Sequence, residues 1–252
     1  MTHPAKKKNL RLVEKPRYAR TRMYAMEIIQ ILILGVALGS IPSGVLLAKL
    51  FRLPDPRYIG SGNIGATNML RTGNKKVALL TLLLDAGKGA VAVIITQHLF
   101  GQTVLDVSRA AVDSCGMRPD LTNCGIQVIA PSLTALALLA SAVGHMYTPW
   151  LKFKGGKGVA TILGAALAFS WPVGMATIVL WLIVFFVKRY VSLASMLALA
   201  VMPLIAWLRV DGTSALIIAV AVALMIWRHR ENIDRLRKGF EPRMRFGKGG
   251  GQ

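Results

Sequence analysis

The sequence predicts an all-α protein, a polytopic integral membrane helical bundle with about seven transmembrane helices. Two observations support this prediction. Apolar residues make up 54% of the 252-residue chain, and they gather in long segments with few charges. The formal charge of +20 lies mainly outside those segments, in two basic ends and in polar loops. This segregation excludes a disordered chain, a collagen, a coiled coil and a small disulfide-rich domain.

The first apolar segment, residues 26–48, is long enough to cross a bilayer, and Glu27 is its only charged residue. A cleaved signal peptide is the competing interpretation. The segment is long for one and lacks an Ala-x-Ala end, which favours a retained span. Residues 1–25 before it form a basic N-terminal extension with eight Lys or Arg.

Two further spans follow at residues 77–100 and 126–147, joined by a polar loop at 101–125. This loop contains both cysteines, Cys115 and Cys124. A disulfide between them and two unpaired thiols are equal alternatives in an oxidising compartment. Neither cysteine has a histidine at the spacing of a zinc site, so no metal site is predicted.

The last apolar segments, 158–187 and 191–227, are each longer than one span needs. A Trp-Pro pair at 171–172 and a polar run at 209–212 favour two helices in each segment. Hydropathy alone allows five to seven spans, and these two turns favour seven.

The distribution of Lys and Arg predicts the orientation. The loops 49–76 and 148–157, the pair at 188–189 and the C-terminal end hold 19 of them, against three on the other side. The first group is therefore expected in the cytoplasm. An odd number of spans then places the basic extension outside, against the rule. Either translation starts at Met23 or Met26, or the extension is translocated despite its charge. No nucleic-acid partner is predicted, because cations beside apolar spans usually set topology and contact anionic lipid headgroups.

A glycine-rich segment at 60–73, GSGNIGATNMLRTG, is the first candidate site. It matches the dinucleotide pattern G-x-G-x-x-G, but the strand and soluble βαβ unit that this pattern requires are absent. Small residues still let backbone N–H groups approach an anion. The expected anion-binding residues here are Gly60, Ser61, Gly62, Asn63, Thr67, Asn68 and Arg71. The guanidinium of Arg71 is suited to phosphate.

A second loop rich in glycine and lysine, residues 152–158, leads into an apolar helix. Unpaired N–H groups at a helix start, with a lysine beside them, make an anion site. The expected members are Lys154, Gly155, Gly156, Lys157 and Gly158. Lys152 has even odds of being only a topology-setting charge.

Ionisable residues also lie inside or beside the spans. Asp85 and Lys88 are three residues apart, on one helix face, and a structural pair is as plausible as a functional one. His145 and His229 lie at predicted cytoplasmic boundaries, and His145 is expected to be a substrate- or phosphate-binding residue. A helix continuing past His229 would place Asn232 on the same face.

The segments GSGNIGATNMLR, GHMYTPWLKFKGGKGVAT and KRYVSLAS with RHRENI resemble the three signature regions of the bacterial acyl-phosphate-dependent glycerol-3-phosphate acyltransferases (PlsY). The resemblance runs from about Ile31 to about Lys238. It implies a multi-pass enzyme of the bacterial inner membrane, with seven helices and a cytoplasmic active site. Such an enzyme moves a fatty acyl group from acyl phosphate to the sn-1 hydroxyl of glycerol 3-phosphate. Lysophosphatidic acid and phosphate are the products, in the first step of phospholipid synthesis.

Carried over to this sequence, the family's catalytic and phosphate-binding set falls on Ser61, Arg71, Lys157, His229 and Asn232. The resemblance implies no cofactor. The implied partners are acyl phosphate, glycerol 3-phosphate, membrane lipid and the enzyme that produces acyl phosphate. The resulting domain organisation is the extension at 1–25, a membrane acyltransferase domain at 26–238 and a polar C-terminal tail at 239–252. The tail is expected to be dispensable for the chemistry.

Two other functions are weighed against this one. A transporter or channel for an anionic solute would use Asp85 and Lys88 as relay groups. Its site would lie near the membrane midplane, whereas these motifs gather at one face. A lipid-anchored scaffold with basic ends would leave the glycine-rich loops unexplained.

Overall fold

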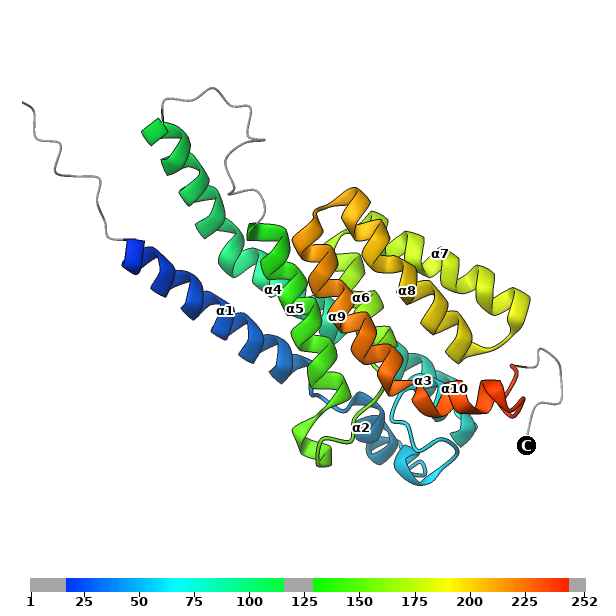
Figure 1. Cartoon of the computed structure of the whole chain (residues 1–252). Coiled ribbons are helices and arrows are strands. Elements are labelled where there is room, and N and C mark those ends of the chain that lie inside the picture. The colour runs from blue at the N-terminus through cyan, green and yellow to red at the C-terminus, as the bar shows by residue number, and fades with distance from the viewer. Residues whose placement is uncertain (1–16, 116–128, 245–252) are drawn as a thin grey trace, which may run out of the picture.

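The computed structural model describes residues 17–115 and 129–244, with side chains over 25–100 and 131–244. Within these ranges the chain is helical and forms the expected all-α membrane bundle (Figure 1). Its helices are α1 (Arg17–Gly39), α2 (Ser43–Leu50), α3 (Ala66–Met69), α4 (Lys75–Cys115), α5 (Ile129–Met146), α6 (Val159–Phe169), α7 (Trp171–Lys188), α8 (Val191–Arg209), α9 (Gly212–Arg228) and α10 (Arg230–Arg237). Short 3₁₀ turns lie at Pro56–Tyr58, Leu70–Thr72 and Pro149–Leu151.

Four segments of the described chain are long and apolar enough to cross a membrane. They are Ala25–Leu50, Lys75–Phe100, Trp171–Lys188 and Val191–Arg209, and the number is five if the bent pair α9–α10 is counted as one span. Helix α6 has 11 residues, roughly 17 Å of helix, which is shorter than the hydrocarbon core. A count of seven complete spans therefore stays a prediction.

Both predicted divisions of the long apolar segments are confirmed. Ser170 is extended between α6 and α7, and Pro172 occupies the first turn of α7, where its missing N–H breaks no helical bond. Helix α9 begins after Asp211, whose carboxylate accepts a hydrogen bond from the Ser214 N–H at 2.8 Å. Each division is thus made by an ordinary helix-start residue.

The first span contains a break that the sequence analysis did not anticipate. Pro42 separates α1 from α2, because it lacks an N–H and disfavours helix at the residue before it. The break leaves two backbone carbonyls without helical partners. Thr148 donates its hydroxyl to the Ser40 carbonyl at 2.5 Å, and the Lys88 ammonium donates to the Ile41 carbonyl at 2.8 Å. The break is therefore bonded both to the turn after α5 and to α4.

The prediction of a polar loop at residues 101–125 is wrong for residues 101–115, which are helical. Helix α4 continues to Cys115, over 41 residues, which is about 60 Å and twice the hydrocarbon thickness. Residues 101–115 contain no proline, so their polarity marks a helix leaving the apolar layer rather than a loop. The Cys115 side chain and all of Cys124 lie outside the described part, as do residues 1–16 of the basic extension. Residues 17–25 of that extension belong to α1.

Helix α5 lies at the centre of the bundle and packs against α1, α4, α6 and α9. Its contact with α1 depends on two glycines, because a Cβ at Gly39 would overlap the Ser141 carbonyl and one at Gly144 would overlap the Val36 carbonyl. Helices α2, α3 and α10 gather at the end of the bundle away from the α8–α9 turn (Figure 1). The predicted site residues lie on this end.

Candidate active site

Asn68 organises the first glycine-rich loop. Its amide nitrogen donates to the carbonyls of Pro56 (2.7 Å) and Ile59 (3.1 Å), and its oxygen accepts from the N–H (3.1 Å) and hydroxyl (3.3 Å) of Ser61. These four bonds use the full capacity of the side chain, which is buried. Asn68 therefore positions Ser61, and the expectation that Asn68 itself binds substrate phosphate does not fit this geometry.

Gly60 brings Arg71 next to Ser61. Its φ of +53° favours glycine, and a Cβ here would overlap the Arg71 guanidinium and the Asn68 oxygen. Arg71 is exposed and has no hydrogen bond or ion pair with the described residues. Its planar fork of N–H donors is therefore available to an anion beside the Ser61 hydroxyl.

The remaining predicted members of this loop, Gly62, Asn63 and Thr67, make few side-chain contacts with the rest of the site. Thr67 and Gly62 are exposed, and the Gly62 N–H is already bonded to the Ile59 carbonyl at 2.9 Å. The side-chain oxygen of Asn63 is buried and has no hydrogen-bond partner among the described residues. Of these three residues, Thr67 alone presents an exposed side-chain donor.

The second loop folds back over the end of α5. The N–H groups of Gly155 and Gly156 donate to the carbonyls of Met146 (3.1 Å) and His145 (3.0 Å). A Cβ at Gly156 would overlap the His145 imidazole. These N–H groups are therefore not open to an anion, contrary to expectation. The two glycines serve close packing, and α6 begins after Gly158, which has a φ of +83°.

Arg228 holds the other side of the same loop. Its guanidinium donates to the carbonyls of Gly155 at 2.8 Å and Gly156 at 3.2 Å. Arg228 is not among the residues predicted from the sequence, because it is one of several arginines at the end of a span. Its position directly before the predicted site residue His229 is the sequence feature that could have indicated it.

Lys157 lies at the centre of the second cluster. Its ammonium donates a hydrogen bond to the Asn232 side-chain oxygen, and Asn232 on α10 is buried. Burial, together with the positive charge of Arg235, lowers the pKa of Lys157 to about 8. Two of the predicted site residues, 75 positions apart in the chain, are thus in direct contact.

Glu241 completes this cluster from the predicted tail. One carboxylate oxygen accepts from the Ser192 hydroxyl and from the Asn232 amide, both at 2.6 Å, and the other accepts from Arg235 at 2.8 Å. Burial would raise the pKa of Glu241, but these hydrogen bonds outweigh it and lower the pKa. Because Glu241 holds the amide end of Asn232, the oxygen end faces Lys157.

His229 lies where the chain bends by 56° between α9 and α10. The bend replaces the continuous helix considered in the sequence analysis. The ring Nδ1 is 2.8 Å from the Met225 carbonyl, which can only accept, so Nδ1 carries the proton. In a neutral ring, Nε2 then has a free lone pair. His229 is therefore set to accept a hydrogen bond from a hydroxyl.

The intramembrane residues form a separate, deeper group. Lys88 and Asp85 make an ion pair at 2.8 Å, and the His145 Nδ1 lies 3.6 Å from the same carboxylate oxygen. His145 is buried beneath Gly156, so the expectation that it binds substrate is not supported by its position. With the Lys88 bond to Ile41, this group joins α4 to the α1–α2 break, which favours the structural interpretation.

Comparison with known proteins decides the family. The glycerol-3-phosphate acyltransferase family model matches residues 29–239. The chain belongs to the glycerol-3-phosphate acyltransferase family. The enzyme of that name from Rhodospirillum rubrum is 45% identical over 211 residues, covering 83% of this chain and 88% of that protein. The enzyme from Jannaschia is 44% identical over 213 residues, covering 84% of this chain and 90% of that protein.

Solved structures agree with this family assignment. The crystal structure of PlsY, an integral membrane glycerol 3-phosphate acyltransferase, in its glycerol 3-phosphate form has a TM-score of 0.70 and 36% identity. The matched region covers 86% of this chain and 96% of the PlsY chain. The structure of the lysophosphatidic acid form of PlsY has a TM-score of 0.68 and 35% sequence identity to this chain. The resemblance seen in the sequence is confirmed, and this chain is an integral membrane acyltransferase.

The acyltransferase thus has two cationic clusters at one end of its bundle (Figure 1). The Arg71 cluster comprises Gly60, Ser61, Asn68 and Arg71, and the Lys157 cluster comprises Lys157, Arg228, His229, Asn232 and Glu241. No hydrogen bond or ion pair between described residues joins the two clusters. Within the described ranges, no group of His, Cys, Asp and Glu could hold a metal ion. Lys154 is exposed and belongs to neither cluster.

Proposed function

We propose that this acyltransferase takes its fatty acyl group from acyl phosphate and transfers it to the sn-1 hydroxyl of glycerol 3-phosphate. Lysophosphatidic acid and phosphate are released, in the first step of phospholipid synthesis. The observation that carries the proposal is the pair of cationic clusters. Two substrates that each carry a phosphate need two sites of positive charge, since the phosphates would otherwise repel each other. The glycerol 3-phosphate and lysophosphatidic acid forms of PlsY support this acceptor and product.

The Lys157 cluster suits the acceptor. Lys157 would bind the phosphate of glycerol 3-phosphate as a point charge, and Asn232 would hold the lysine in place. The free Nε2 of His229 would accept a hydrogen bond from the attacking hydroxyl. Holding a hydroxyl in attack geometry removes much of the entropic barrier, and such positioning supplies up to roughly 7–11 kcal/mol.

The Arg71 cluster suits the donor. Arg71 would bind the phosphate of acyl phosphate through its guanidinium, and the Ser61 hydroxyl would turn from its bond with Asn68 to donate to the developing oxyanion. The hydroxyl oxygen attacks the acyl carbonyl, an ester bond forms and the bond to phosphate breaks. The hydroxyl proton leaves its hydrogen bond with His229 and ends on the departing phosphate. No acyl-enzyme is needed, because acyl phosphate is already an activated mixed anhydride.

We place the active site at the cytoplasmic face of the bacterial inner membrane. The loops that carry both clusters belong to the side with most of the Lys and Arg. Acyl phosphate is reactive towards water, so direct delivery by the enzyme that produces it would limit hydrolysis. This supports the producing enzyme as a partner.

The proposal is tested by comparing donors with purified protein in detergent or lipid. Glycerol 3-phosphate is supplied with either acyl phosphate or acyl-CoA of the same chain length. Mass spectrometry of the product measures turnover, and NMR of freshly extracted product assigns the acylated position. We expect 1-acyl product from acyl phosphate and little from the thioester. A faster reaction with acyl-CoA would overturn the donor assignment, and a 2-acyl initial product would overturn the position.

A further inference from the structure

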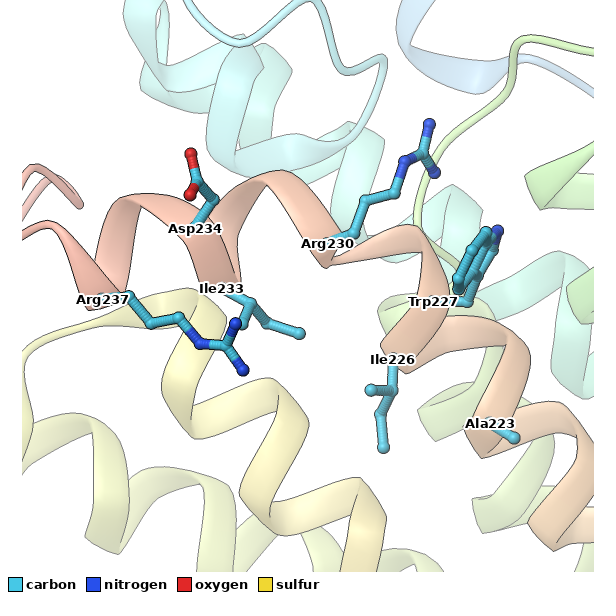
Figure 2. Close-up of a pocket in the computed structure, with 7 residues that line it drawn as sticks. All are labelled: Ala223, Ile226, Trp227, Arg230, Ile233, Asp234 and Arg237. Atoms are coloured by element: carbon cyan, nitrogen blue, oxygen red, sulfur yellow. The ribbon is translucent and has the colours of Figure 1, made fainter.

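A groove of about 400 Å³ lies at the bend between α9 and α10 (Figure 2). Its apolar wall is formed by Ala223, Ile226, Trp227 and Ile233. Arg230, Asp234 and Arg237 line its polar part. None of these residues belongs to the two cationic clusters described above.

The groove lies on the reverse face of α10 from the Lys157 cluster. At about 100° per residue, Arg230, Asp234 and Arg237 share one face of this helix. Asn232, which contacts Lys157 and Glu241, points from the opposite face. The groove is therefore separate from the acceptor site.

An exposed apolar stripe of α9 leads into the groove. Leu216, Val220 and Trp227 lie on one helix face, at 68%, 45% and 63% exposure. In a membrane-spanning helix such a stripe faces the acyl chains of the bilayer. Tryptophan at the end of a span is typical of the headgroup level. The groove thus begins where the apolar layer ends.

The charges at the groove favour an anion at that level. Arg230 lies over the Trp227 ring, with its guanidinium carbon 5.7 Å from the ring centroid. Asp234 is paired with Lys238 at 3.0 Å, so these two residues and the two arginines together keep a net positive charge. Neither Arg230 nor Arg237 makes an ion pair with a described residue. A net positive charge therefore follows an apolar stripe.

We propose that this groove binds an anionic phospholipid of the surrounding bilayer. Its phosphate binds at the polar part of the groove, where the side chains of Arg230 and Arg237 project from opposite sides of α10 (Figure 2) and must turn towards it, and one acyl chain lies along the stripe of α9. Basic residues at a membrane surface attract anionic lipid. Two of them should enrich the anionic lipid roughly tenfold or more over the bulk bilayer.

The test uses Trp227 as a reporter in the full-length protein. The protein is reconstituted in phosphatidylcholine nanodiscs that contain a small fraction of chain-brominated phosphatidylglycerol or chain-brominated phosphatidylcholine. Bromine quenches tryptophan on contact, and Trp227→Phe protein isolates the Trp227 signal from the other tryptophans. We expect the brominated anionic lipid to quench Trp227 at a concentration roughly tenfold below that of the zwitterionic lipid.

Two variants separate a specific site from general surface charge. Arg230→Gln with Arg237→Gln should abolish the preference. Lys75→Gln with Lys76→Gln removes two exposed charges elsewhere and should retain it. Equal quenching by both lipids in the unaltered protein would overturn the proposal, as would a preference that survives the arginine changes or disappears with the lysine changes. Displacement of phosphatidylglycerol by equimolar lysophosphatidic acid would assign the groove to the product instead. The readout needs no turnover, so it is independent of the proposed donor.

Discussion

The Arg71 cluster and the Lys157 cluster hold their cations in opposite ways. Arg71 is exposed, lies against a glycine and has no partner among the described residues. Lys157 is partly buried and is bonded to Asn232, which is itself bonded to Glu241. One cation is free to follow its ligand, and the other is fixed before the ligand arrives.

The difference has a physical consequence. A fixed donor needs little reorganisation when charge develops at the reacting centre, but burial lowers the pKa of the lysine that provides it, here to about 8. The exposed guanidinium avoids that desolvation but must lose side-chain freedom when it binds. The Lys157 cluster should therefore be sensitive to its neighbours and to pH, and the Arg71 cluster to neither.

The largest expected effect comes from removing either cation. Lys157→Ala and Arg71→Ala should each lower kcat/KM for glycerol 3-phosphate acylation at least a hundredfold, since one lost charge-stabilising contact typically costs about 2.7–4 kcal/mol. Lys157→Ala should be the more severe, because it also leaves the buried Asn232 oxygen unpaired. Steady-state kinetics on variants with an unchanged gel-filtration profile and circular dichroism spectrum measures this. Near-normal turnover of a folded Lys157→Ala protein would refute the site assignment.

Loss of Glu241 should have the next largest effect. Truncation after Phe240 removes it, so Asn232 loses the acceptor that orients its amide, and we expect turnover to fall tenfold or more. This reverses the expectation that the whole polar tail is dispensable. Glu241→Gln should act in the same direction, because one amide cannot accept from all three donors.

Truncation after Met244 is the matched control for the shorter chain. It keeps Glu241 and the bond from the Met244 N–H to the Arg189 carbonyl at 2.9 Å, and we expect unchanged turnover. Equal activity of both truncated proteins would show that Asn232 does not depend on Glu241.

The pH dependence should separate the two clusters further. The protonated lysine binds phosphate, and its pKa in the folded protein, about 8, lies below the ordinary 10.5. Binding is therefore lost, not gained, as the pH rises through 8. We expect kcat/KM for glycerol 3-phosphate to fall about tenfold per pH unit above that value. Lys157→Arg should remove this alkaline decline at whatever activity remains. A similar decline in Lys157→Arg protein would assign the titration to another group.

The sequence predicted features that depend on neighbouring residues more readily than features that depend on distant ones. The Trp-Pro pair at 171–172 and the polar run at 209–212 divide their helices as expected, because helix starts are local. The prediction missed the break at Pro42, whose freed carbonyls are satisfied by Thr148 and Lys88 from other elements. It also treated polar residues 101–115 as a loop, because polarity alone does not separate a loop from a helix outside the membrane.

The same division applies to the site. Arg71 lies in a glycine-rich segment and Lys157 lies between two glycines, and these local patterns marked both. The structural role of Asn68 and the contact of Glu241 with Asn232 depend on tertiary geometry. The loop glycines show the converse, because their spacing suggested free N–H groups that the fold in fact bonds to α5.

The smallest expected effect is at Lys152, in the same loop as Lys157. Lys152 is exposed, and its φ of +53° places it in a left-handed turn, so asparagine is a better replacement than alanine because it tolerates that conformation. Lys152→Asn should change kcat/KM by less than about threefold, since one exposed charge contributes little at moderate salt. Kinetics at two ionic strengths, beside Lys157→Ala, provides the measurement. A tenfold loss would mean that exposed charge in this loop contributes as much as the fixed lysine, and the contrast between the two clusters would then fail.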